Sequence, residues 1–352
     1  MRNRVTFITA AIASTLLIAA GCAKTIDPAS ERGSIRFVAG SLLLNDDATK
    51  AGTLKTGFDN PGSDKFYVWG AKTVSSNRQA IFNGDEVTLQ SLGVWSYSPV
   101  RFWDSDASQY DFLAISGPAS SEGIICNPSI AGHLNASVTY SSTLAQYDLL
   151  AAAYQRRDGS TTPVPMEFKH VLSAVSVVVY NDSPSITVTL NSYRFRNICT
   201  SATVNVEQGV NGLANVGIGN WTNHGYSTSP VLGSAGTELV TGTHFPQTEI
   251  IDLMVPAHLD VVEPYVPQLV IDYQYDAEDP LNPPAIIHHD VVTPIRLQDI
   301  KIRGSEECIT EWLPGKKYNY EIHIRMGGGI IVNVSTTDWE TVPAETPGLT
   351  IQ

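Results

Sequence analysis

The stretch YNYEIHIRMGGGIIVNVST, residues 318–336, sets the fold class of this chain. After its three glycines, Ile330, Val332 and Val334 occupy every second position, and alternate residues of a strand share one face. Residues 318–325 form a second strand candidate, and Gly327-Gly328-Gly329 can serve as the hairpin turn between the two. The stretch therefore predicts a pair of β-strands.

Most of the remaining chain follows the same pattern. Segments with period two, or short apolar runs, alternate with Gly, Pro, Asn and Ser, and helix signals are scarce. The further strand candidates are residues 34–39, 65–69, 86–89, 111–115, 149–154, 174–180, 185–190, 250–255 and 268–275. Strands at this spacing, with turn residues between them, predict an all-β chain built of β-sandwiches.

The chain length predicts two domains, because about 330 residues remain after the leader and one hydrophobic core rarely spans that many. The best internal break is Thr161-Thr162-Pro163-Val164-Pro165, since two prolines remove ladder donors and favour an extended connector. The predicted organisation is a signal peptide at 1–21, a tether at 22–33, sandwiches at 34–162 and 163–340, and a tail at 341–352.

The amino terminus has the features of a lipoprotein signal peptide. Arg2 and Arg4 precede an apolar stretch that ends in Ala19-Ala20-Gly21-Cys22, and this stretch is too short for a convincing membrane span. Cleavage before Cys22 would leave a thiol that carries a diacylglycerol and anchors the protein to a membrane. The alternative is an ordinary secretion signal with an incidental cysteine.

Charge and cysteine usage narrow the classes of partner. Removal of residues 1–21 leaves 20 basic and 35 acidic residues, a formal balance of −15. Nucleic acid is a poor candidate partner, because phosphate binding needs a basic patch. Cys126, Cys199 and Cys308 have no metal-ligand spacing and could form at most one disulfide, so we interpret them mostly as buried apolar residues.

Six aromatic residues lie between Trp95 and Phe112. An exposed platform for sugars would stack Trp95 or Trp103 on a pyranose ring, beside Tyr97, with Asp104 or Arg101 binding the hydroxyls. The competing interpretation, which we favour, places these rings in the core, because aromatic residues dominate cores generally.

A set of short motifs resembles the fimbrillin-like (Mfa-like) family of bacterial surface lipoproteins. Their order and spacing together carry the resemblance. The motifs are Phe66-Tyr67-Val68-Trp69-Gly70, Trp95-Ser96-Tyr97, Arg101-Phe102-Trp103-Asp104, Tyr110-Asp111-Phe112-Leu113-Ala114, residues 166–174 (MEFKHVLSA), residues 312–320 (WLPGKKYNY) and Thr337-Asp338-Trp339-Glu340.

The resemblance implies two tandem transthyretin-like sandwiches, export to the outer membrane and cell surface with a lipid anchor, and polymerisation with other fimbrillin subunits into a fimbrium. In the family, a trypsin-like protease removes the first strand, and the open groove accepts a strand from a neighbouring subunit. Adhesion to host or bacterial surface ligands and biofilm formation would follow. Shaft, tip and anchor roles all remain open.

The residues themselves allow this assembly step. Ile35, Phe37 and Ala39 alternate with neighbours and can present one face to a core, so they form a candidate replaceable strand. Residues 45–53 are typical of an exposed loop, which makes Lys50 the first candidate for cleavage and Lys55 the second.

The candidate donor is the carboxyl-terminal end. It comprises Ile330, Val332 and Val334 together with the tail from Trp339 onward. The tail alternates poorly, because Pro343 and Pro347 interrupt it, and this leaves room for an anchor, tip or accessory subunit.

No catalytic, cofactor or metal site is predicted. His288-His289-Asp290 places two histidines on opposite faces of a strand, and His170 opens an apolar strand as a structural residue. The acids from Asp272 to Asp279 lack EF-hand spacing and indicate a solvated turn. We expect a fimbrial subunit, with a lipid-anchored glycan-binding module of a polysaccharide-uptake system as the alternative. A glycosidase would need two carboxylates facing one cleft, which the sequence does not identify.

Overall fold

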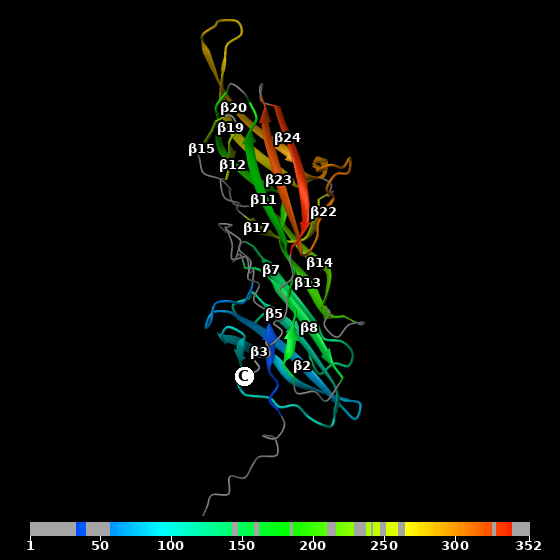
Figure 1. The fold of residues 1–352 in the computed structure, drawn as a ribbon. Coiled ribbons are helices and arrows are strands. Elements are labelled where there is room, and N and C mark those ends of the chain that lie inside the picture. The colour runs from blue at the N-terminus through cyan, green and yellow to red at the C-terminus, as the bar shows by residue number, and fades with distance from the viewer. Residues whose placement is uncertain are drawn as a thin grey trace, which may run out of the picture.

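The computed structural model describes residues 33–39, 57–142, 147–157, 162–183, 186–209, 216–228, 237–240, 242–246, 251–259, 265–325 and 329–339. These residues form strands and one short 3-10 helix, η1 (Leu297–Asp299), which confirms the all-β prediction. None of their helical segments has the length and apolar character needed to span a membrane. The strands gather into two sandwiches at opposite ends of an elongated molecule (Figure 1).

The first sandwich is organised around a central six-stranded sheet. Its strand order is β10 (Lys169–His170), β8 (Leu150–Arg156), β5 (Ala107–Ser116), β2 (Lys65–Val74), β3 (Asn77–Ser91) and β4 (Val94–Ser96). All of these neighbours pair antiparallel.

Both faces of this central sheet are buried. Phe66 and Phe112 belong to the core on one face, whereas Trp69 and Leu113 belong to the core on the other. Successive side chains of a strand point to opposite faces, so a strand covered on both sides needs apolar residues at every position. This explains why β2, β5 and β8 contain continuous apolar runs.

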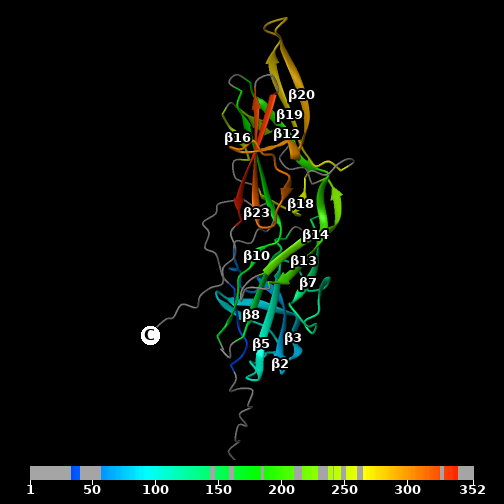
Figure 2. The same cartoon turned by 90° about the vertical axis from the view of Figure 1, so that its right-hand side faces the viewer.

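Two layers cover the central sheet. One is a four-stranded sheet of order β14 (Val216–Ser227), β13 (Ile198–Gln208), β7 (Asn135–Ser141) and β6 (Ile124–Cys126), seen beside β5 and β2 in Figure 2. The other is the parallel pair of β1 (Phe37–Ala39) and β9 (Val164–Met166).

The predicted boundary at residues 162 and 163 does not separate the sheets. β13 pairs with β7 from Ser201↔Ser141 to Glu207↔Asn135, and β9 pairs with β1, so strands on both sides of the boundary share the first sandwich. Pro163 and Pro165 flank the start of β9, a short strand, rather than a linker between domains. The sequence break was a local signal, whereas strand partners are chosen by long-range packing.

The second sandwich contains the hairpin that the sequence indicates most clearly. One sheet has the order β16 (His244–Phe245), β11 (Ser173–Asn181), β23 (Lys316–Arg325), β24 (Gly329–Asp338) and β21 (Lys301–Ile302), with β17 (Ile251–Met254) also beside β11. The other has the order β15 (Thr237–Leu239), β12 (Val188–Arg196), β19 (Gln268–Glu278) and β20 (Ile286–Arg296). Tyr320 and Ile322 of β23 are fully buried between the sheets.

Three of the sequence motifs meet where the two sandwiches join. The Gly315 N–H donates to the Leu172 carbonyl at 2.9 Å, and the Trp339 N–H donates to the Gly315 carbonyl at 2.8 Å. The Trp339 ring stacks on His170 with centroids 3.6 Å apart, and His170 Nδ1 lies 2.9 Å from a carboxylate oxygen of Asp148. Gly315 has φ of 67°, a conformation that other residues rarely adopt. These residues, with the short strand pair β18 (Ala257–His258) and β22 (Glu311–Trp312), form the joint between the sandwiches.

Candidate strand-exchange site

Residues 33–39 close one face of the first sandwich. Ile35, Phe37 and Ala39 are each at most 3% exposed, whereas Arg36 between them is exposed. Val38 is also buried at 8%, so the opposite face of the segment is covered as well. The opening segment is therefore an integral part of the sandwich.

Backbone hydrogen bonds hold this segment between two different parts of the chain. On one side, the Ile35 N–H donates to the Arg101 carbonyl at 2.9 Å and the Trp103 N–H donates to the Gly33 carbonyl at 3.2 Å. On the other, the Val164 N–H donates to the Arg36 carbonyl at 2.7 Å and begins the parallel pairing with β9. Removal of the segment would take away these hydrogen bonds.

Phe37 is the centre of the aromatic core on this face. Its ring makes edge contacts with Phe66, Phe82, Tyr97 and Phe112, with centroids 5.5 to 5.8 Å apart. Full burial of one such side chain stabilises the fold by about 1.5–3 kcal/mol. A strand that replaced residues 33–39 would need an apolar residue at this position.

Tyr97 is a partner of the segment that the sequence did not identify. Its hydroxyl donates to the Ile35 carbonyl at 2.6 Å, and burial raises the pKa of that hydroxyl above its usual value. The sequence signal was its position inside an aromatic cluster, which does not specify whether a ring packs in a core or binds a ligand. Tyr97 therefore links the segment to the loop that follows β4.

The interpretation of Trp95 and Trp103 as an exposed sugar-binding platform is wrong. Trp95 and Trp103 are 9% and 6% exposed and belong to the core that contains Phe37. Tyr97 contacts Ile35, and Asp104 pairs with Lys72 at 2.6 Å. Neither indole presents a face to solvent, because both rings are needed to fill the space over the central sheet.

Several predicted site residues lie outside the described part of the chain. These are the lipidation residue Cys22, the candidate processing residues Lys50 and Lys55, the leader and tether before residue 33, and the tail from residue 340 onward. Their roles remain predictions.

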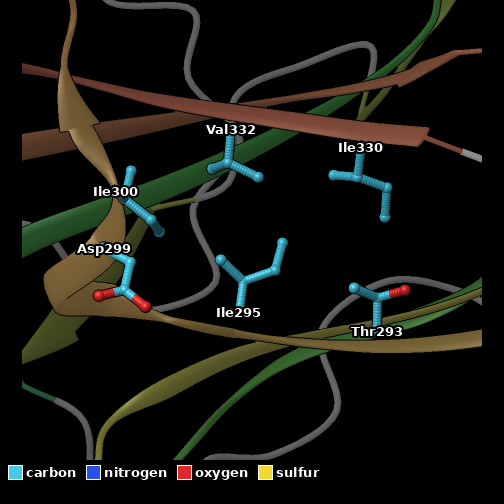
Figure 3. A pocket seen from close by; sticks show the side chains of 6 residues that line it. All are labelled: Thr293, Ile295, Asp299, Ile300, Ile330 and Val332. Atoms are coloured by element: carbon cyan, nitrogen blue, oxygen red, sulfur yellow. The ribbon is translucent and has the colours of Figure 1, made fainter.

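The candidate donor residues of β24 are already engaged in their own sandwich. β24 pairs with β23 along its whole length, from Arg325↔Gly329 to Lys316↔Asp338, and Val334 is fully buried. Ile330 and Val332 face Ile295 of β20 across a cavity of about 260 Å³, as Figure 3 shows. β24 is therefore fixed in a sheet, and only the chain beyond Trp339 is left as a candidate donor.

The surface acids and histidines have protein partners. Asp272 accepts a hydrogen bond from Asn191 at 2.9 Å, the Asp279 carboxylate accepts the Leu281 N–H in a turn, and His288 pairs with Asp276 at 2.6 Å. Among the residues that the structure describes, no group of three or more potential metal ligands comes together.

Cys126, Cys199 and Cys308 are free thiols. Cys199 is buried, and Cys126 and Cys308 are half-buried. Burial raises the pKa of Cys126 to about 11 and that of Cys199 to about 12, so both thiols stay protonated at neutral pH.

Comparison with known proteins identifies the family. Residues 49–339 match the fimbrillin-like family, which is most of the chain. No curated protein matches significantly.

Solved structures with a similar arrangement include a fimbrial protein from Bacteroides vulgatus, with 13% identity, a TM-score of 0.49, and coverage of 78% of this chain and 93% of that one. A proposed cell adhesion protein from Bacteroides uniformis has 18% identity, a TM-score of 0.43, and coverage of 89% and 100%. A fimbrilin from Porphyromonas gingivalis has 10% identity, a TM-score of 0.39, and coverage of 89% and 98%.

The family match agrees with the motifs that meet at the joint and with the all-β architecture. Members of this family are structural proteins rather than enzymes. The chain belongs to the fimbrillin-like family.

Proposed function

We propose that this chain is a lipid-anchored fimbrial subunit that assembles at the cell surface by exchange of its first strand. Residues 33–39 are the replaceable element. Their burial in an aromatic groove formed by residues distant in sequence carries the proposal, because such a groove can accept an equivalent strand from another molecule. Acylated Cys22 holds the precursor at the outer membrane, and the assembled fimbrium supports adhesion and biofilm formation.

Loss of the first strand raises the free energy of the subunit, so that binding of a replacement strand is favourable. It removes Ile35 and Phe37 from the core and leaves the Arg101 carbonyl, the Trp103 N–H and the Val164 N–H without their partners. Each buried polar group left unpaired costs about 1–3 kcal/mol. A strand from a neighbouring subunit that supplied an apolar residue and backbone partners would recover most of this free energy.

The processed bond lies after Lys50 or Lys55, in the stretch between the first strand and Phe58. The donated strand lies in residues 340–352, since β24 itself is fixed between β23 and β21. The subunit position in the fimbrium, as shaft, tip or anchor, depends on whether this tail can enter a neighbour's groove.

Limited digestion of the purified precursor with trypsin tests the proposal. We expect one early cleavage after Lys50 or Lys55, release of the leading peptide, and a ladder of oligomers that resist denaturant. The double variant Lys50→Gln/Lys55→Gln should stay intact and monomeric, whereas Lys301→Gln, an exposed lysine in β21, should assemble as the native chain does. Persistent monomers after clean cleavage would contradict strand exchange.

Deletion of residues 340–352 separates the donor from the acceptor. The truncated chain should be cleaved normally and should fail to form ladders by itself. It should still accept the tail of a full-length chain and cap its oligomers. If the truncated chain polymerised unchanged, the donor would have to lie elsewhere.

A further inference from the structure

A second pocket lies at one end of the first sandwich, away from the replaceable strand. Its volume is about 340 Å³, and it opens between the end of the central sheet and the loop before β7. The residues that line it are Thr73, Ser76, Arg78, Gln109, Ala131, Gly132, His133, Gln155 and Arg157. Neither the family match nor the proposed assembly step uses this pocket.

The strand register places the polar residues of the pocket in one row. Thr73 of β2 stands opposite Arg78 of β3 on one side and Gln109 of β5 on the other. Arg157 directly follows β8, whose last residue is paired with Tyr110, next to Gln109. Side chains in register on adjacent strands share a face, so this row forms one wall of the pocket.

A buried network beneath the pocket fixes three of the side chains that line it. Asp111 is 1% exposed and accepts hydrogen bonds from Arg78 Nη1 at 2.5 Å and from Gln155 Nε2 at 2.9 Å. It also accepts from Gln109 at 2.9 Å and from Gln208 of β13 at 3.0 Å. The pocket is therefore held in shape before any ligand arrives, which lowers the entropic cost of binding.

The chemistry of the lining is cationic and rich in hydrogen-bond donors. Two arginines and a histidine line the pocket, and no carboxylate is among the described residues that line it, although the chain as a whole has a net charge of −13 and Arg78 is paired with the buried Asp111. The Arg78 side chain is nine-tenths buried, and its Nη2 finds no acceptor among the described residues. Arg157 is exposed, so its guanidinium is accessible to a ligand.

We propose that this pocket binds a carboxylate-bearing saccharide unit, such as a hexuronic acid. Arg157 binds the carboxylate, because a guanidinium pairs with a carboxylate through two parallel hydrogen bonds. Thr73, Gln109 and Gln155 provide hydroxyl and amide groups of the kind that bind sugar hydroxyls.

The size of the pocket favours a sugar over a small inorganic anion. Small-molecule sites usually measure about 300–1,000 Å³, and this pocket falls at the lower end of that range. None of the described residues that line it is Phe, Tyr or Trp, so recognition by these residues depends on hydrogen bonds and charge. The ligand is therefore selected mainly by its carboxylate.

Titration of the intact, uncleaved chain with glucuronic acid, followed by amide NMR and calorimetry, tests the proposal without any strand exchange. We expect saturable binding of glucuronic acid, with shifts concentrated at residues 73–78, 109, 131–133 and 155–157. Glucose, sulfate and acetate should each bind at least about tenfold more weakly, because each lacks either the carboxylate or the sugar hydroxyls.

Arg157→Gln should weaken glucuronic acid binding about tenfold or more, and Arg157→Lys should retain part of it. The control is Arg325→Gln, which makes the same change in charge at an exposed position of β23 and should leave binding unchanged. Equal binding of sulfate or acetate would reduce the pocket to a general anion site and overturn the saccharide assignment. Absence of binding by glucuronic acid, or an unchanged affinity in Arg157→Gln, would also overturn it.

Discussion

Phe37 contacts four aromatic rings and is 3% exposed, so its truncation leaves a cavity that its neighbours cannot fill. We expect Phe37→Ala to lower the free energy of unfolding by about 3–5 kcal/mol. Arg36→Ala, one residue away and exposed, should change it by less than about 0.5 kcal/mol. Urea unfolding of both variants measures the difference, and similar losses in the two would show that the segment is not packed as described.

Asp252 of β17 makes stability depend on pH. The residue is only 6% exposed, and burial raises the pKa of its carboxyl group to about 6. An aspartate in the unfolded chain has a pKa of about 3.9. Between this pKa and the folded pKa, the folded chain binds more protons than the unfolded chain, so its stability falls as pH rises. The protonated carboxyl group pays no desolvation penalty for its charge. The full free-energy cost of burying the ionised carboxylate is present above the folded pKa.

Replacement of this group should therefore stabilise the protein at neutral pH only. Asp252→Asn is expected to raise the free energy of unfolding by up to about 3 kcal/mol at pH 7.5, and to change it little near pH 4. Asp106→Asn, at an exposed position, provides the control. Thermal melts between pH 4 and pH 7.5 measure the difference in stability between Asp252→Asn and the native chain. An equal stabilisation at both pH values would exclude titration of Asp252 as its cause.

At the scale of elements, the turn between β2 and β3 is strained. Ser75 and Ser76 have φ of 48° and 66°, as a type I′ hairpin turn requires, although Asn-Gly is the favoured pair there. The left-handed conformation costs a residue with a side chain about 1–2 kcal/mol. We expect Ser75→Asn/Ser76→Gly to raise the midpoint of unfolding, whereas Ser108→Gly, within strand β5, should lower it.

The joint between the sandwiches depends on the stack of Trp339 on His170. Trp339→Ala should destabilise the protein by at least about 1 kcal/mol, because the stack and its buried area are both lost. Trp339→Phe should retain most of the stability. Calorimetric melts of the two variants are the measurement, and equal losses would mean that the ring contributes little beyond its backbone hydrogen bond.

Local patterns predicted most of the strands. All of the strand candidates overlap observed strands, since period-two alternation and apolar runs report burial directly. The long hairpin of β13 and β14 was missed, although Ala202, Val204 and Val206 of β13 alternate with polar residues, because β14 consists mostly of glycine and polar residues. Its partner β7 lies about sixty residues earlier, and such pairing is decided by tertiary packing.

The site was predicted only in part. The alternation of Ile35, Phe37 and Ala39 correctly indicated one buried face. The sequence could not place Trp95 and Trp103, because the same residue types fill cores and bind ligands. It also missed that Arg78 and Gln208 converge on Asp111, since three separate strands bring them together.

At the scale of the whole molecule, the first sandwich needs strands from both sides of Pro163. A fragment of residues 33–162 lacks β9, β10, β13 and β14, so the apolar faces of its central sheet are uncovered. We expect this fragment to show no cooperative unfolding transition, whereas residues 33–339 should unfold cooperatively. Circular dichroism during urea titration tests this, and a sharp transition in the fragment would contradict the shared architecture.

The return of β13 and β14 into the first sandwich also determines how the subunit would respond to mechanical tension. Two domains joined by a simple linker extend at that linker when their ends are pulled apart. Here the chain crosses between the sandwiches three times, at β10–β11, β12–β13 and β14–β15, so a force that pulls the sandwiches apart is shared by three segments instead of one. A fibre built from such subunits would resist stretching, and flow or surface traction would be transmitted along it without opening the joint.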